Sequence, residues 1–155
     1  MLKFVDYDIV FQEIPDEVTL AINISNCPNR CIGCHSPFLW DDVGVELNSE
    51  ALKLLLDKYG SAATCLCFMG GDGDVEALFS LAMWLRENSV LKIGWYSGKE
   101  QLPAKFNPKL FDYVKIGPYI EEFGNLKSPK TNQRLYKINY EGEFEDITYR
   151  FWKEI

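Results

Sequence analysis

Strand-like patterns of apolar and polar residues recur along the chain. Residues 18–25 (VTLAINIS) alternate and are rich in β-branched side chains, which predicts a strand that leads directly into a cysteine-containing loop. Shorter apolar stretches at 64–69, 91–97 and 111–117 predict three further strands. The final patterned segment, RLYKINYEGEFEDITYRFW, predicts a β-hairpin that turns at Glu141-Gly142.

Two segments have the periodicity of amphipathic helices. Residues 48–60 offer Asn48 as an N-terminal cap and Gly60 as a stop signal. Residues 75–87 predict a second helix. The apolar positions expected to face the core are Leu52, Leu55, Leu56 and Tyr59 in the first helix, and Leu78, Leu81, Ala82 and Leu85 in the second.

The order of these elements predicts the fold class. Strands that alternate with helices indicate an α/β protein with a mainly parallel sheet. In such a sheet, ligands bind at the carboxyl ends of the strands. Both the cysteine loop and the Gly70-Gly71-Asp72 turn follow predicted strands. No repeat, low-complexity tract or linker divides the sequence, so residues 1–155 are expected to form one domain.

Charge and composition narrow the range of functions. The 16 basic and 23 acidic side chains give a formal charge of −7, which argues against binding to nucleic acid or to an anionic membrane. Residues 1–10 lack the apolar core and cleavage site of a signal peptide, and no apolar run reaches the length of a membrane span. We therefore expect a cytoplasmic protein. In that reducing compartment, its five cysteines suit metal binding or chemistry better than disulfides.

Three of the cysteines form a C-x3-C-x2-C motif made of Cys27, Cys31 and Cys34. Pro28 and Gly33 disfavour a regular helix there, so we expect a loop curled around a metal centre. Three thiolates can hold zinc together with a fourth ligand, or an iron–sulfur cluster that leaves one iron open. An open coordination position can admit a small chelating molecule.

A fourth zinc ligand could come from His35, Cys65 or Cys67. His35 directly follows Cys34, which strains their joint ligation of one ion. Cys65 and Cys67 lie two positions apart in a predicted strand and belong to no Cys-x2-Cys knuckle. Packing in the core is the simpler expectation for these two thiols. Structural zinc remains an alternative to the cluster.

The cysteine motif that leaves a strand, followed about forty residues later by Gly70-Gly71-Asp72, resembles the radical S-adenosylmethionine superfamily. The resemblance implies an incomplete, open (βα) barrel of that superfamily. It implies a [4Fe-4S] cluster with Cys27, Cys31 and Cys34 as ligands to three irons. The amino and carboxylate groups of S-adenosylmethionine would then chelate the fourth iron.

The resemblance also implies which residues hold this cofactor. Glycines at 70 and 71 would let the backbone approach the methionine ammonium, and an acid at 72 would complement its charge. An electron from the reduced cluster would cleave the sulfonium to a 5′-deoxyadenosyl radical, so no catalytic side chain is expected. Backbone groups at 33–35 would lie near the adenine, and for Ser97 a plain turn is an equally good explanation. The implied binding residues are Gly33, Cys34, His35, Gly70, Gly71, Asp72 and Ser97.

Two departures from the superfamily pattern point to a subgroup. Gly33 stands where many members carry an aromatic residue, and Asp72 stands where glutamate is usual. A glycine before the third cysteine resembles the activating proteins of anaerobic ribonucleoside-triphosphate reductase, which belong to the glycyl-radical activating enzymes. The segments IGWYSG at 93–98 and DYVKIGPYIEEFGNLKSPKTNQRLY at 112–136 resemble the same subgroup.

The subgroup implies a specific reaction. The adenosyl radical would abstract a hydrogen atom from a glycine α-carbon of the large reductase and leave a glycyl radical there. A low-potential donor such as flavodoxin or ferredoxin would supply the electron. Asn132, Gln133 and Arg134 could contact the reductase or the cofactor, although a capped turn explains them equally well. The rival functions are another small radical enzyme, such as a 7-carboxy-7-deazaguanine synthase-like cyclase, and a non-catalytic zinc-binding module.

Overall fold

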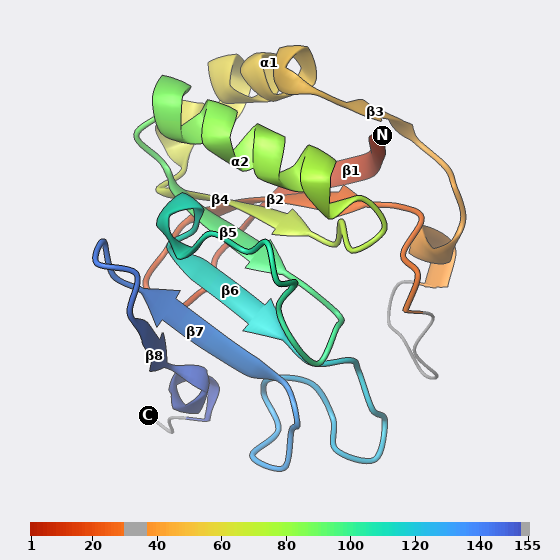
Figure 1. Ribbon diagram of the computed structural model, residues 1–155, viewed down its shortest axis with the longest axis vertical. Coiled ribbons are helices and arrows are strands. Elements are labelled where there is room, and N and C mark those ends of the chain that lie inside the picture. The colour runs from red at the N-terminus through yellow and green to blue at the C-terminus, as the bar shows by residue number, and fades with distance from the viewer. Residues whose placement is uncertain (30–36, 153–155) are drawn as a thin grey trace.

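A computed structural model describes residues 1–29 and 37–152. Its eight strands form one continuous sheet in the order β3-β1-β2-β4-β5-β6-β7-β8. Two α-helices lie on one side of this sheet (Figure 1). The strands are β1 (Leu2–Val10), β2 (Thr19–Ile24), β3 (Val45–Leu47), β4 (Cys65–Met69), β5 (Lys92–Tyr96), β6 (Tyr113–Ile116), β7 (Arg134–Ile138) and β8 (Phe144–Asp146). The helices are α1 (Ser49–Tyr59) and α2 (Val75–Asn88), with 3-10 turns η1 (Pro37–Trp40), η2 (Gly60–Ala62), η3 (Pro108–Leu110) and η4 (Thr148–Phe151).

The sheet is mixed, which corrects the prediction of a mainly parallel one. The pairings β2–β4, β4–β5 and β5–β6 are parallel, whereas the other four pairings of the described strands are antiparallel. The physical reason lies in the connections. The strands of β1–β2 and of β7–β8 are joined by residues 11–18 and 139–143, and these connections are shorter than the crossover of about a dozen residues that a parallel pair needs.

The expected open barrel of βα units is likewise not found. β3 and β8 are the two edges of the sheet and do not pair with each other in the described part of the chain. The sequence patterns also do not reveal β1 and β3. In β1 the residues from Val5 to Asp8 are all exposed, which weakens the alternation, and β3 has only three residues. The α/β class itself is correct.

Both predicted helices are confirmed, together with the predicted caps of the first, Asn48 and Gly60. The Asn48 side chain accepts a 2.9 Å hydrogen bond from the amide of Ala51 at the start of α1. Asp74 accepts a 3.2 Å hydrogen bond from the amide of Ala77 at the start of α2. These acceptors satisfy amides that have no partner within the helix. The predicted C-terminal hairpin is confirmed as β7 and β8, with Gly142 at a positive φ of 86°.

Alternating side chains of the parallel strands build two cores, one on each face of the sheet. The face toward the helices contains the larger cluster, in which the strand residues Leu20, Ile22, Ile24, Leu66, Phe68, Ile93, Trp95 and Val114 meet the buried leucines of α1 and α2. The opposite face carries a smaller cluster made of Ile14, Cys65, Cys67, Tyr113, Leu126, Leu135 and Ile147. No helix in the described ranges is both long and apolar enough to cross a membrane.

Candidate functional site

Three loops meet where the parallel strands end. Cys27 lies three residues beyond β2, Gly70 follows β4 and Ser97 follows β5. The amide of Gly70 donates a 3.1 Å hydrogen bond to the carbonyl of Tyr96, and the amide of Ser97 donates one of 2.9 Å to the carbonyl of Lys115. These bonds extend the parallel ladder beyond the strands and hold the loops side by side, as expected for the carboxyl edge of a parallel sheet.

The base of the cysteine loop is fixed by the chain that returns from it. The amide of Asn26 bonds the carbonyl of Asp41 at 2.9 Å, and the amide of Cys27 bonds the carbonyl of Leu39 at 2.8 Å. Asn26 has a positive φ of 56°, a conformation that asparagine tolerates better than most residues. The Cys27 thiol is half-buried and forms no disulfide. Four predicted site residues, Gly33, Cys31, Cys34 and His35, lie outside the described residues.

The Gly70-Gly71 turn requires glycine at both positions. The φ angles of 117° and 105° favour glycine, and a Cβ at Gly70 would lie 3.1 Å from the carbonyl oxygen of Ile24. The Gly70 carbonyl accepts a 2.8 Å hydrogen bond from the indole of Trp95, and the Gly71 carbonyl accepts one of 3.2 Å from the amide of Asp74. Each carbonyl has a second lone pair, so both can still accept a hydrogen bond from a ligand.

The Asp72 carboxylate joins the three loops. Its Oδ1 accepts a 2.6 Å hydrogen bond from the Ser97 hydroxyl, and its Oδ2 accepts 2.8 Å from the Gly98 amide and 2.7 Å from Asn29 Nδ2. The same Asn29 nitrogen lies 3.5 Å from the Sγ of Cys27. The structure therefore brings together the predicted residues Cys27, Asp72 and Ser97, and it adds Asn29. A lone amide in a loop has no periodic signature in the sequence, so Asn29 could not have been singled out.

Lys115 is a buried cation at the same edge. Only 8 % of this residue is exposed, and its Nζ donates 3.0 Å hydrogen bonds to the carbonyls of Ser97 and Gly117. Nζ also lies 5.8 Å from the centre of the Tyr96 ring, within the range of a cation–π interaction. The sequence analysis did not single out Lys115. Its signal in the sequence is a lysine within the apolar stretch 111–117, because buried lysines are rare unless paired.

Two adjoining cavities lie beside these loops. The inner cavity, about 200 Å³, is bordered by Cys27, Asn29, Gly70, Asp72 and Gly98 among others. The outer cavity, about 450 Å³, lies within the usual size range of ligand pockets. The two cavities adjoin, and Met69, Tyr96, Lys115, Tyr119 and Gln133 line both of them.

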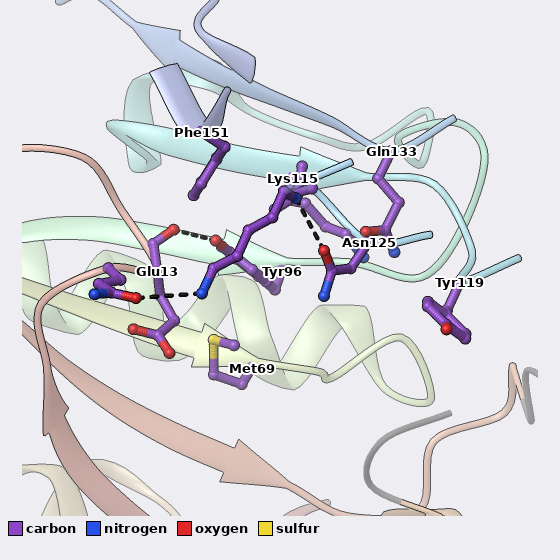
Figure 2. A pocket seen from close by; sticks show the side chains of 11 residues that line it. Glu13, Met69, Tyr96, Lys115, Tyr119, Asn125, Gln133 and Phe151 are labelled. Atoms are coloured by element: carbon purple, nitrogen blue, oxygen red, sulfur yellow. Dashed lines mark hydrogen bonds between the residues drawn. The ribbon is translucent and has the colours of Figure 1, made fainter. Parts of the chain in front are cut away.

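The outer cavity combines an apolar wall with amide side chains. Figure 2 shows Met69, Tyr96 and Phe151 around one part of it, with Tyr119 at the end away from Glu13. The Tyr96 hydroxyl donates a hydrogen bond to the main-chain carbonyl of Glu13, which fixes the ring. The amides in the lining are Gln12, Asn125 and Gln133.

The Thr131–Arg134 segment is only partly a site segment. Gln133 borders both cavities, whereas Asn132 donates a 3.0 Å hydrogen bond to the carbonyl of Pro118. Arg134 instead lies 3.6 Å from the carboxylate of Asp146 and over the ring of Trp152. Of the polar residues that the sequence singled out here, Gln133 is the one placed to touch a ligand.

Cys65 and Cys67 lie in the core on the face away from the helices, both with 0 % exposure. Burial raises the pKa of both thiols well above the ordinary value, and the charge of Glu17 adds to the effect at Cys65. Neutral thiols are poor metal ligands and poor nucleophiles. Within residues 1–29 and 37–152, no group of three His, Cys, Asp or Glu side chains is arranged to hold a metal ion.

Comparisons with protein-family models, with curated proteins and with solved structures find no match to this chain.

Proposed function

We propose that this protein is a radical S-adenosylmethionine activating enzyme that generates a glycyl radical on anaerobic ribonucleoside-triphosphate reductase. The observation that carries the proposal is the Asn29 carboxamide, whose nitrogen lies 3.5 Å from the Cys27 sulfur and 2.7 Å from Asp72. It joins the first cysteine of the C-x3-C-x2-C motif to the Gly-Gly-Asp turn. Two motifs that the sequence separates by about forty residues thus meet at one edge of the sheet.

Cys27 and the Gly70-Gly71-Asp72 turn are the described part of the site that the two proposed cofactors would occupy. Cys27, with Cys31 and Cys34, would ligate a [4Fe-4S] cluster, and the bound cofactors would supply the one-electron and hydrogen-abstraction chemistry. The cavity beside Cys27 has the Gly70-Gly71 backbone and Asp72 on its border. Absence of side chains at 70 and 71 lets a ligand approach carbonyls that can accept a second hydrogen bond.

The proposal also assigns cofactor contacts to Ser97 and to residues 33–35. Ser97 donates a hydrogen bond to Asp72, so Ser97 would orient the Asp72 carboxylate. Gly33, Cys34 and His35, whose segment lies outside the described residues, would border the adenine. Lys115 places a cation between the two cavities. Such a charge would favour an anionic group of the ligand.

The outer cavity suits entry of the reductase's glycine-containing segment. A polypeptide presents backbone amides and carbonyls, and the side chains of Gln12, Asn125 and Gln133 can bond to both kinds of group. The outer cavity adjoins the inner one, so a segment seated there would lie next to the cofactor site. The apolar wall would exclude water from a reactive intermediate. A cytoplasmic location and a low-potential donor such as flavodoxin or ferredoxin complete the proposal.

Anaerobic reconstitution with iron and sulfide tests the proposal directly. We expect a reduced [4Fe-4S] paramagnetic signal that changes when S-adenosylmethionine is added, and release of methionine and 5′-deoxyadenosine. Incubation with the reductase should then give a glycyl-radical signal on the reductase. Colourless protein that keeps one stoichiometric zinc and shows no such signal would favour a zinc-binding module. Cofactor cleavage with turnover of a deazapurine precursor, and none on the reductase, would favour the cyclase.

A further inference from the structure

The Asn29 carboxamide lies between the Cys27 sulfur and the Asp72 carboxylate. Its Nδ2 carries two hydrogens, and its two neighbours are Asp72 Oδ2 at 2.7 Å and Cys27 Sγ at 3.5 Å. One hydrogen can therefore point at each acceptor. The bond to the carboxylate is the stronger of the two because its acceptor is charged, so Asp72 sets the orientation of the amide.

Asp72 bridges two loops through its hydrogen bonds. Both carboxylate oxygens accept hydrogen bonds from neutral donors, namely the Ser97 hydroxyl, the Gly98 amide and Asn29. These donors come from two different loops, so the carboxylate holds the cysteine loop against the end of β5.

The packing of Asn29 against Gly98 is a second, independent constraint on the Asn29 side chain. A Cβ at residue 98 would lie 2.5 Å from Asn29 Nδ2 and 3.0 Å from its Cγ. The Asn29 carboxamide thus packs against the Gly98 backbone, in space that a side chain at residue 98 would need. Local packing and hydrogen bonding specify the same Asn29 rotamer.

We infer that Asn29 and Asp72 form a positioning pair that fixes the Cys27 sulfur and supplies it with an N–H···S hydrogen bond. The inference rests on the proposed function, in which Cys27 ligates a cluster. Hydrogen bonds to the ligating sulfurs help to set the reduction potential of such clusters. A donor at Cys27 stabilises the more negative reduced state, so the pair raises the potential and eases reduction by a biological donor.

The decisive variant is Asn29→Leu, which keeps the size of the side chain and removes the donor. Its matched control is Asn23→Leu. The Asn23 amide donates 2.6 Å to Asp6, also borders the inner cavity, and has no bond to the Cys27 sulfur. Gly98→Ala tests the same geometry from the other side, because its Cβ would displace the carboxamide.

The first measurement uses the apoprotein and needs no cofactor. Amide hydrogen exchange at Cys27, which is bonded to Leu39, should accelerate about tenfold or more in Asn29→Leu and in Gly98→Ala, because a hydrogen bond to a charged group is lost. Asn23→Leu should stay close to wild type. Unchanged exchange at Cys27 in both test variants, with all proteins folded by circular dichroism, would overturn the positioning role.

The second measurement is the reduction potential of the reconstituted cluster. Asn29→Leu should shift it to a lower value than Asn23→Leu does. Equal potentials in the two variants would overturn the role of the N–H···S bond. Failure of the wild type to bind any cluster would overturn the proposed function and this second role with it, whereas the apoprotein measurement still decides the positioning of Cys27.

Discussion

The indole Nε1 of Trp95 donates a 2.8 Å hydrogen bond to the carbonyl oxygen of Gly70. Trp95 is fully buried on the helix-facing side of β5, where its ring lies edge-to-face with Phe79. A residue of the core under the helices therefore holds the first glycine of the candidate site. This hydrogen bond links the packing of the core to the geometry of the site.

Replacing Trp95 with phenylalanine should weaken this link. The Gly70 carbonyl would lose a buried partner, and we expect the free energy of unfolding to fall by about 1–3 kcal/mol. Urea denaturation of the apoprotein measures this loss. The control is Trp84→Phe in α2, where the tryptophan is half-buried against the same core. A loss no larger in Trp95→Phe than in the control would contradict the importance of the bond.

Two glycines should respond in opposite ways to alanine. A Cβ at Gly94 would lie 2.8 Å from Ile14 Cδ1 and 3.2 Å from Cys67 Sγ, both in the core. Gly94→Ala should therefore destabilise the protein by about 1–3 kcal/mol through overpacking. Gly60 has a φ of −59° and only ordinary contacts, so Gly60→Ala should be neutral or stabilise by up to about 1 kcal/mol. Thermal unfolding of both variants tests the contrast, and equal melting temperatures would refute it.

The sequence predicted the elements that bury a continuous apolar face. All four parallel strands and both helices lie within a few residues of their predicted ranges, because their inward positions must be apolar in any such sheet. The N-terminal antiparallel strands β1 and β3 were missed, because the residues from Val5 to Asp8 of β1 are all exposed and β3 has only three residues.

The candidate site was predictable only where a motif has a fixed spacing. The Gly70-Gly71-Asp72 turn stands at a strand end as expected, and the structure brings it to Cys27. Asn29 could not have been found, because its role depends on which loops meet in space. For the same reason, the neutral donors on Asp72 show an anchoring role that its charge alone did not suggest.

Glu17 should make stability depend on pH. It is buried where β4 and β5 begin and accepts hydrogen bonds from Tyr113 at 2.6 Å, Lys92 at 2.9 Å and Thr64 at 2.7 Å. Burial alone would raise its pKa, but these donors outweigh burial and leave the pKa below the ordinary value. A depressed pKa in the folded state contributes stability above the unfolded-state value, about 4.3, and that contribution disappears as the pH falls through the folded value.

Glu17→Gln should therefore lower the free energy of unfolding at pH 7 and reduce its dependence on pH below about 4.3. Urea unfolding from neutral to acid pH measures both effects. Glu145→Gln, an exposed substitution on β8, should leave the curve close to wild type. Parallel curves for wild type and Glu17→Gln across the acid range would show that the Glu17 cluster does not contribute in this way.

Alanine substitutions should distinguish the cysteines that ligate the cluster from the cysteines that pack in the core. Cys31→Ala removes one of three proposed ligands, so we expect loss of the cluster and of methionine release. Cys67→Ala removes a buried neutral thiol and should leave both largely intact, at a modest cost in stability. Iron and sulfide content after reconstitution gives the measurement. Loss of the cluster in Cys67→Ala would overturn the assignment of that residue to the core.

Blocking the outer cavity should separate cofactor cleavage from radical transfer. Gln12 is exposed at its border and receives a 3.2 Å hydrogen bond from Lys127. Gln12→Trp adds bulk at the entrance and leaves the inner cavity unchanged, so methionine release without the reductase should persist. Glycyl-radical formation on the reductase should fall about tenfold or more, because a misplaced segment loses its orientation toward the reacting atom. The control is Gln101→Trp, exposed and outside both cavities. Equal radical yields from the two variants would rule out this cavity as the path of the segment.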